Sequence, residues 1–262
     1  MAEKNQGVTY RFIENRWTKV DFTEVSSHPH DHRPPVLLVH GQPGCGTRWG
    51  SLPEVLNSKF NVFSYDRPGW GKNRTRAKNV NENAALLEDV VENLRKFLGT
   101  TPIVVAYSYG GAIAVSSLTN NPSKYASVLL IAPAISTLAI NRYDRILTYP
   151  ILGSVVSLVT SLFSTKYVGS SLLDIVQSTR SLRIEGINLL QELSQMPSRD
   201  LSNVKVSILS GTADFVTPPE SIYDGANKYS ITSIEWINGG SHLLPWKNSE
   251  SILSFALRTL SL

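Results

Sequence analysis

Short apolar runs alternate along most of the chain with segments in which apolar residues recur every three or four positions. The run Val36–Val39 is closed by His40 and Gly41, and it is typical of a strand buried on both faces of a parallel sheet. The segment Asn83–Leu98 has the second pattern and stops at Gly99, as an amphipathic helix does. Because strands and helices alternate, we expect an α/β fold with a mostly parallel sheet covered on both faces.

The same patterns predict the remaining elements of this core. Further strands are expected at 60–65, 102–106, 127–132, 205–209 and 233–237, and further helices at 110–119, 219–228 and 249–260. Two runs of mixed alternation, 8–14 and 16–24, predict a hairpin with a turn near Asn15, followed by a surface loop at 27–35.

The alternation breaks between Pro133 and about Asn203, where the pattern is helical throughout. This segment follows the carboxyl end of a strand, the edge of an open α/β sheet where ligands bind. We therefore predict a core made of residues 1–135 and 197–262. Residues 136–196 are predicted to form a helical lid inserted after the strand that ends near Ala132.

A candidate nucleophile lies in the segment 106–111, Ala-Tyr-Ser-Tyr-Gly-Gly, between a predicted strand and a predicted helix. A sharp turn there requires small residues two places before and two places after its central residue, and Ala106 and Gly110 meet this requirement. The turn would expose the Ser108 hydroxyl at the helix N-terminus, where the backbone N–H of Tyr109 favours a developing negative charge.

In this motif, and in the order of its elements from Val36 to Leu260, the chain resembles the α/β-hydrolase superfamily. The family motif is usually Gly-x-Ser-x-Gly, and this chain has Ala106 at the first small position. The resemblance implies the α/β-hydrolase fold, with Ser108 as nucleophile. Epoxide hydrolases and haloalkane dehalogenases of the same fold carry aspartate at this position, whereas a serine alkoxide suits an acyl carbon.

The segment 40–44, His-Gly-Gln-Pro-Gly, resembles the His-Gly-x-Pro-Gly loop of the same family. By that resemblance the backbone N–H groups of Gln42 and Tyr109 would form the oxyanion hole. A plain strand-to-helix turn would also favour glycine and proline there. We expect His40 to be structural, and the segment 66–71, Asp-Arg-Pro-Gly-Trp-Gly, to be a structural turn.

The other two catalytic partners are expected in the order acid, then histidine. Asp214 ends a Gly-x-x-Asp turn after a predicted strand, and it resembles the acid of the family. His242 follows the last predicted strand and resembles the catalytic histidine. Asp224, inside the next predicted helix, and Asp144, in the predicted lid, are the rival acids.

These residues predict a serine hydrolase that cleaves an ester-type bond in a small, partly apolar substrate through an acyl-enzyme. Two alternatives stay open. The acyl group could pass to an alcohol, amine or peroxide, as in an acyltransferase or perhydrolase, or the fold could serve only to bind a ligand. No cofactor is implied.

Composition limits which binding partners and which cellular compartment we expect for this chain. The chain has 262 residues, of which 42% are hydrophobic and 18% charged, with a net charge of +4 and no dense basic block, so we expect no nucleic-acid partner. The single cysteine, Cys45, excludes an internal disulfide, and the polar start of the chain lacks a signal-peptide pattern. We therefore expect a cytoplasmic protein, with the role of Cys45 and the oligomeric state left open.

Two further segments carry weaker signals. The segment 28–32, His-Pro-His-Asp-His, is one residue short of a metallo-β-lactamase signature, so we expect no metal site. Residues 146–165 carry no charge but are interrupted by Pro150 and Gly153. We expect no stable membrane insertion, while an apolar lid helix leaves room for weak contact with a lipid surface.

Overall fold

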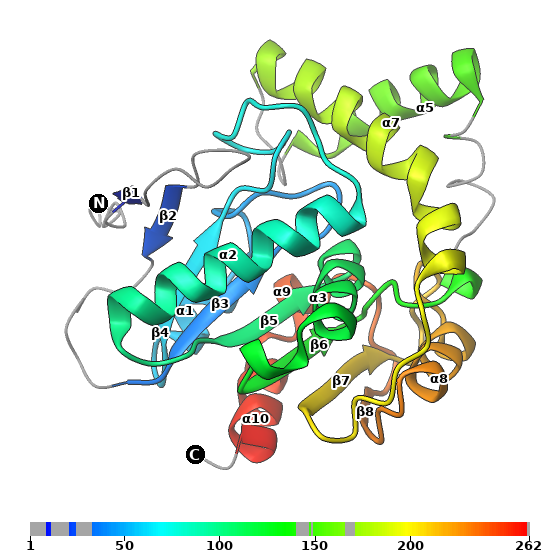
Figure 1. Ribbon diagram of the computed structural model, residues 1–262. Coiled ribbons are helices and arrows are strands. Elements are labelled where there is room, and N and C mark those ends of the chain that lie inside the picture. Colours follow the sequence, from blue (N-terminus) through cyan, green and yellow to red (C-terminus); the bar gives the residue numbers. More distant parts are fainter. Residues whose placement is uncertain are drawn as a thin grey trace.

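The computed structural model describes residues 9–11, 21–24, 33–139, 147, 149–165 and 171–260. Its described part contains an eight-stranded sheet in the order β1-β2-β4-β3-β5-β6-β7-β8 (Figure 1). The strands are β1 (Thr9–Arg11), β2 (Asp21–Glu24), β3 (Pro35–Val39), β4 (Asn61–Tyr65), β5 (Ile103–Tyr107), β6 (Ser127–Ile131), β7 (Lys205–Gly211) and β8 (Ser233–Ile237). All pairs from β4 to β8 are parallel, whereas β1 and β2 pair antiparallel. The predicted mostly parallel sheet is confirmed.

The helices and helical turns follow the expected alternation. They are α1 (Leu52–Leu56), α2 (Val80–Leu98), α3 (Tyr109–Asn120), η1 (Pro122–Lys124), η2 (Thr137–Ala139), α5 (Pro150–Phe163), α7 (Leu172–Gln195), α8 (Pro219–Lys228), α9 (Leu244–Lys247) and α10 (Ser249–Leu260). Helix α2 begins at Val80 rather than at the predicted Asn83, because Asn79 and Glu82 form a reciprocal capping box. The short helices α1 and α9 were not predicted.

The core lies on both faces of the sheet. Leu37, Val39 and Ala106 pack against α2 and α3 on one face, while Val36 and Leu38 pack against α1 and α10 on the other. Every residue of β3, β4, β5 and β6 is buried, which is why β3, β5 and most of β6 are apolar in the sequence, whereas β4 also buries Asn61 and Ser64. Figure 1 shows α2 and α3 in front of the sheet and α10 behind it.

Among the described residues between β6 and β7, in the segment expected to be a lid, helices α5 and α7 follow the short turn η2. Helices α5 and α7 pack against each other and stand together at the top of Figure 1. Helix α5 exposes large apolar side chains, with Ile151 82% and Phe163 83% exposed. No helix in the described part of the chain has the length and apolarity needed to cross a membrane.

Some expectations concern residues outside the described part. These are the turn near Asn15, the histidine segment 28–32, the rival acid Asp144 and parts of the uncharged segment 146–165. They stay predictions.

Candidate active site

Ser108 lies at the sharp turn between β5 and α3. Its backbone has φ 53° and ψ −119°, a conformation that residues other than glycine rarely adopt. The Ser108 N–H donates to the carbonyl of Ile131 at 3.0 Å, and the Ser108 carbonyl accepts from Gly111 and Ala134 at 2.8 and 3.0 Å. These bonds tie the turn to β6 and α3, so the surrounding structure sustains the strained backbone and fixes the direction of the hydroxyl.

Two glycines let the chain pass close to this turn. A Cβ added at Gly110 would lie 2.3 Å from the carbonyl oxygen of Val39, so no side chain fits there. A Cβ at Gly41 would lie 2.9 Å from the Ser108 Cβ. The loop after β3 therefore presses directly against Ser108, as the predicted oxyanion loop requires.

Three side chains form one hydrogen-bonded row. The Ser108 Oγ lies 2.9 Å from Nε2 of His242, and Nδ1 of the same ring lies 2.8 Å from Oδ2 of Asp214. Ser108 comes from the end of β5, Asp214 from the turn after β7, and His242 from the loop after β8. The carboxyl ends of three parallel strands thus bring together the residues singled out in the sequence. In this geometry Nδ1–H donates to the carboxylate, and Nε2 is left to accept the hydroxyl proton.

The Asp214 carboxylate is held by several donors. Its Oδ1 accepts the backbone N–H groups of Val216 and Thr217 at 2.8 and 2.9 Å, and its Oδ2 accepts the Thr217 hydroxyl at 2.9 Å. Burial raises the pKa of Asp214. The hydrogen bond and charge of His242, together with the Thr217 bonds, outweigh burial and leave this pKa below its usual value. The carboxylate therefore stays charged next to the imidazole.

The two predicted oxyanion donors belong to segments next to Ser108, and their role stays a prediction. Tyr109 is the first residue of α3, so its N–H has no acceptor inside the helix. Gln42 follows Gly41, where an added Cβ would lie 2.9 Å from the Ser108 Cβ. Two such N–H groups could receive the negative charge that develops on a carbonyl oxygen attacked by Ser108.

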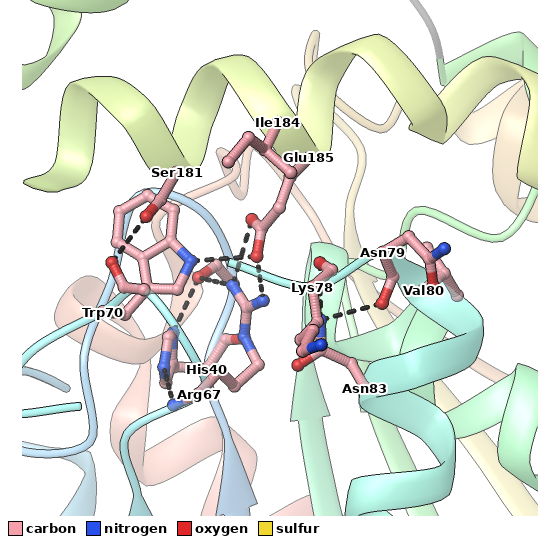
Figure 2. A network of polar contacts seen from close by, with 12 residues as sticks. His40, Arg67, Trp70, Lys78, Asn79, Val80, Asn83, Ser181, Ile184 and Glu185 are labelled. Atoms are coloured by element: carbon pink, nitrogen blue, oxygen red, sulfur yellow. Dashed lines mark hydrogen bonds and ion pairs between the residues drawn. The ribbon is translucent and has the colours of Figure 1, made fainter. Parts of the chain in front are cut away.

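A buried ion pair between Arg67 and Glu185 supports the loop that follows β3. Arg67 donates from Nε to the His40 carbonyl at 3.2 Å and from Nη2 to the Gly41 carbonyl at 3.1 Å. Its guanidinium also pairs with Glu185 of α7, and both side chains are fully buried. Trp70 Nε1 donates to the same carboxylate at 2.9 Å. Figure 2 shows Glu185 reaching down from α7 to Arg67, with Trp70 and His40 beside them.

Comparison with known proteins places this geometry in a family. Residues 36–251 match the alpha/beta hydrolase family. The chain belongs to this family. Human monoglyceride lipase is 25% identical over 213 residues, which cover 72% of this chain and 69% of the lipase. The lipase LipV of Mycobacterium tuberculosis is 30% identical over 106 residues, which cover 38% of each chain.

The solved structures give the same fold. An epoxide hydrolase of Vigna radiata superposes with a TM-score of 0.70 at 15% identity and covers 99% of both chains. At this identity the likeness concerns the fold alone. The chain spans less than half the length of the first curated relatives it matches, between 38% and 45% of three of them.

The other residues singled out in the sequence have different surroundings. Asp224 of α8 accepts a hydrogen bond from Ser136 at 2.5 Å, whereas it is Asp214 that contacts His242. His40 accepts the Arg67 N–H on Nε2 at 3.2 Å and contacts the Gly41 carbonyl through Nδ1 at 2.8 Å. Burial, and then the Arg67 charge, hold the pKa of His40 well below its usual value, so this ring stays neutral. Burial raises the pKa of the Cys45 thiol, which disfavours the thiolate needed for a nucleophile.

Sequence reasoning missed Thr217, Arg67 and Glu185. Thr217 stands three residues after Asp214 and directly before two prolines, a turn-forming pattern that could have identified it. The segment that contains Arg67 is predicted from the sequence as a structural turn, and the sequence does not predict the ion pair of Arg67 with Glu185. Glu185 lies in an amphipathic helix, where a lone carboxylate is typical of a solvated face, so its burial left no signal in the sequence.

Proposed function

We propose that this protein is a serine hydrolase that cleaves ester-type bonds in small, partly apolar substrates, with Ser108, His242 and Asp214 as its catalytic triad. The observation that carries the proposal is the row of contacts from Ser108 Oγ to His242 Nε2 and from His242 Nδ1 to Asp214 Oδ2, at 2.9 and 2.8 Å. A charged carboxylate, a correctly oriented imidazole and a sharp turn that fixes the direction of the nucleophile are the parts that acyl transfer to serine requires.

In the first half of the reaction, the Ser108 oxygen attacks the acyl carbon while its proton passes to Nε2 of His242. The tetrahedral intermediate places its negative oxygen between the N–H groups of Gln42 and Tyr109. The imidazolium, stabilised by Asp214, gives the same proton to the leaving alcohol oxygen as the carbon–oxygen bond breaks. The product of this half is an ester of Ser108 and a free alcohol.

In the second half, His242 takes a proton from water as the water oxygen attacks the acyl carbon. A second tetrahedral intermediate collapses, the Ser108–acyl bond breaks, and the proton on Nε2 returns to the Ser108 oxygen. A carboxylic acid leaves and the resting state is restored. No step requires a group that the chain does not supply.

The identity of the central residue separates this function from others of the same fold. An epoxide hydrolase shares the fold, but alkyl transfer needs a carboxylate nucleophile, and this chain carries a serine at the turn. The names of the relatives, a lipase and a monoglyceride lipase, favour carboxylic esters as the substrate class.

We also propose that residues 136–196 act as a lid. The support is the contact of Glu185 in α7 with Arg67, which in turn holds the carbonyl of Gly41 next to Ser108. A helix tied to the oxyanion loop in this way can cover the site and exclude water from it.

The first prediction tests the nucleophile. Ser108→Ala removes the attacking oxygen, so hydrolysis of p-nitrophenyl butyrate should fall by at least about 10³-fold. A fluorophosphonate probe should label the wild-type protein and leave the variant unlabelled.

Ser58→Ala is the matched control, because Ser58 is an exposed serine just after α1 whose hydroxyl bonds only the nearby Val55 carbonyl. It should keep both turnover and labelling. Hydrolysis by Ser108→Ala at the wild-type rate would refute the proposed function.

A further inference from the structure

A cavity lies away from the three triad residues, between the loop that follows β4 and the first half of α7. Its volume is about 520 Å³, which is within the usual range for small-molecule sites. Its walls come from residues 69–77 of the loop and from 173–184 of α7, and none of the three triad residues lines it. The cavity is therefore a site of its own.

The loop and the helix are fastened to each other around this cavity. Arg74 pairs with Asp174 at 2.7 Å, and Gln177 donates from Nε2 to the Asn73 carbonyl at 2.9 Å. Deeper in, the Ser181 hydroxyl donates to the Gly69 carbonyl at 2.6 Å. Figure 2 shows Ser181 above Trp70, where α7 crosses the loop. These contacts fix the walls before any ligand enters, which lowers the entropic cost of binding.

The lining combines positive charge with apolar surface. Three arginines line the cavity, and only Arg74 has its charge matched, by Asp174. Within the described ranges, no carboxylate lies within ion-pair distance of Arg76 or Arg180. Val176 and Ile184 add apolar surface to the same lining. A ligand that pairs with the arginines and also packs against the apolar side chains must carry an anionic head and an apolar chain.

We propose that this cavity binds an amphipathic anion, namely a carboxylate or a phosphate attached to an alkyl chain. The guanidinium groups of Arg76 and Arg180 would hold the head group by charge-assisted hydrogen bonds. The chain would lie along Val176 and Ile184. The site goes beyond the proposed hydrolysis, because its ligand binds without contacting Ser108.

The test is calorimetric titration of the Ser108→Ala protein, in which no ester or acyl chemistry interferes. The probes are decanoate and decyl phosphate, each below its micelle concentration, and decanol below its solubility limit. Both anions should bind saturably, more weakly at high salt, and decanol should bind at least about tenfold more weakly than the better anion. The tighter of the two anions identifies the head group.

The double variant Arg76→Ala, Arg180→Ala should weaken anion binding by about tenfold. The matched control, Lys59→Ala with Lys247→Ala, removes the same net charge from two exposed sites elsewhere and should bind like the parent protein. Val176→Asp adds a carboxylate to an exposed position of the wall and should abolish anion binding.

Three results would overturn the proposal: no binding of either anion, equal binding of decanol, or anion binding unchanged by loss of the two arginines. The last would place the ligand elsewhere, for example at the triad. Because the titration needs no turnover, failure of this proposal is distinct from failure of the proposed hydrolase function.

Discussion

Among single residues, Thr217 contacts both the acid and the base of the proposed triad. Its hydroxyl lies 2.9 Å from Asp214 Oδ2, 3.2 Å from the Ala132 carbonyl and 3.3 Å from His242 Nδ1. Its backbone N–H donates to the other carboxylate oxygen. Thr217 therefore fixes the plane of the carboxylate against the imidazole and connects both to the end of β6.

Replacing this hydroxyl with a methyl group gives a prediction at the residue scale. Thr217→Val keeps the side-chain shape but removes the hydrogen bond to a charged acceptor, so kcat/KM for an ester should fall about tenfold. Loss of this donor should also raise the pKa of Asp214, because the Thr217 bonds lower it. Kinetics measured as a function of pH would detect both effects.

Thr217→Ser keeps the hydroxyl and should retain most of the activity. If the valine and serine variants lost activity equally, the hydroxyl would have no role in positioning Asp214. The effect would then belong to packing at this position.

At the scale of elements, the buried carboxylate of Glu185 joins α7 to the core. Glu185 is fully buried, and its carboxylate accepts hydrogen bonds from Arg67 and Trp70. If α7 moved away, both donors would be exposed to water or left buried without an acceptor. Removal of one partner from a buried ion pair is far more costly than replacement of the whole pair with apolar groups.

This asymmetry gives a prediction for two variants. Glu185→Leu leaves the Arg67 charge buried and unpaired, and it should lower the free energy of unfolding by about 3–5 kcal/mol. The double variant Arg67→Met, Glu185→Leu should recover most of that stability. Its ester turnover should nevertheless stay low, because the Gly41 carbonyl has lost its donor.

Urea denaturation together with steady-state kinetics separates these outcomes. Gln191→Leu, an exposed substitution on the same helix, serves as the control and should change neither quantity. A Glu185→Leu protein as stable as the wild type would show that Arg67 does not depend on this carboxylate.

The elements also show what the sequence could and could not predict. The strands β3, β5 and β6 were evident because burial on both faces favours continuous apolar runs, and the Ala106 and Gly110 spacing revealed the turn at Ser108. Two contacts escaped prediction, those of Thr217 and Glu185. Each depends on a partner far along the chain or on burial of a polar group, and neither leaves a periodic pattern.

At the scale of the whole molecule, stability should depend on pH through His40. Burial and the Arg67 charge lower the pKa of His40 in the folded protein, so below about pH 6.5 the unfolded chain binds a proton that the folded chain does not. The free energy of unfolding should therefore fall by about 1 kcal/mol between pH 7 and pH 5.5.

Urea unfolding in the His242→Ala background measures this effect without interference from the triad imidazole. In the same background, His40→Gln should flatten the pH dependence over this range, whatever its starting stability. An equal slope with and without His40 would assign the effect to other groups.

The order of the proposed triad along the chain has a consequence for when the proposed ester hydrolysis would appear during folding. Ser108 and His242 are 134 residues apart, and α5, α7 and the two last strands of the sheet lie between them. A growing or refolding chain thus presents its nucleophile long before its base. During refolding, the moment at which ester turnover returns would consequently report when β7 and β8 dock onto the sheet. Early collapse around β3 and β5 would produce no signal in the same assay.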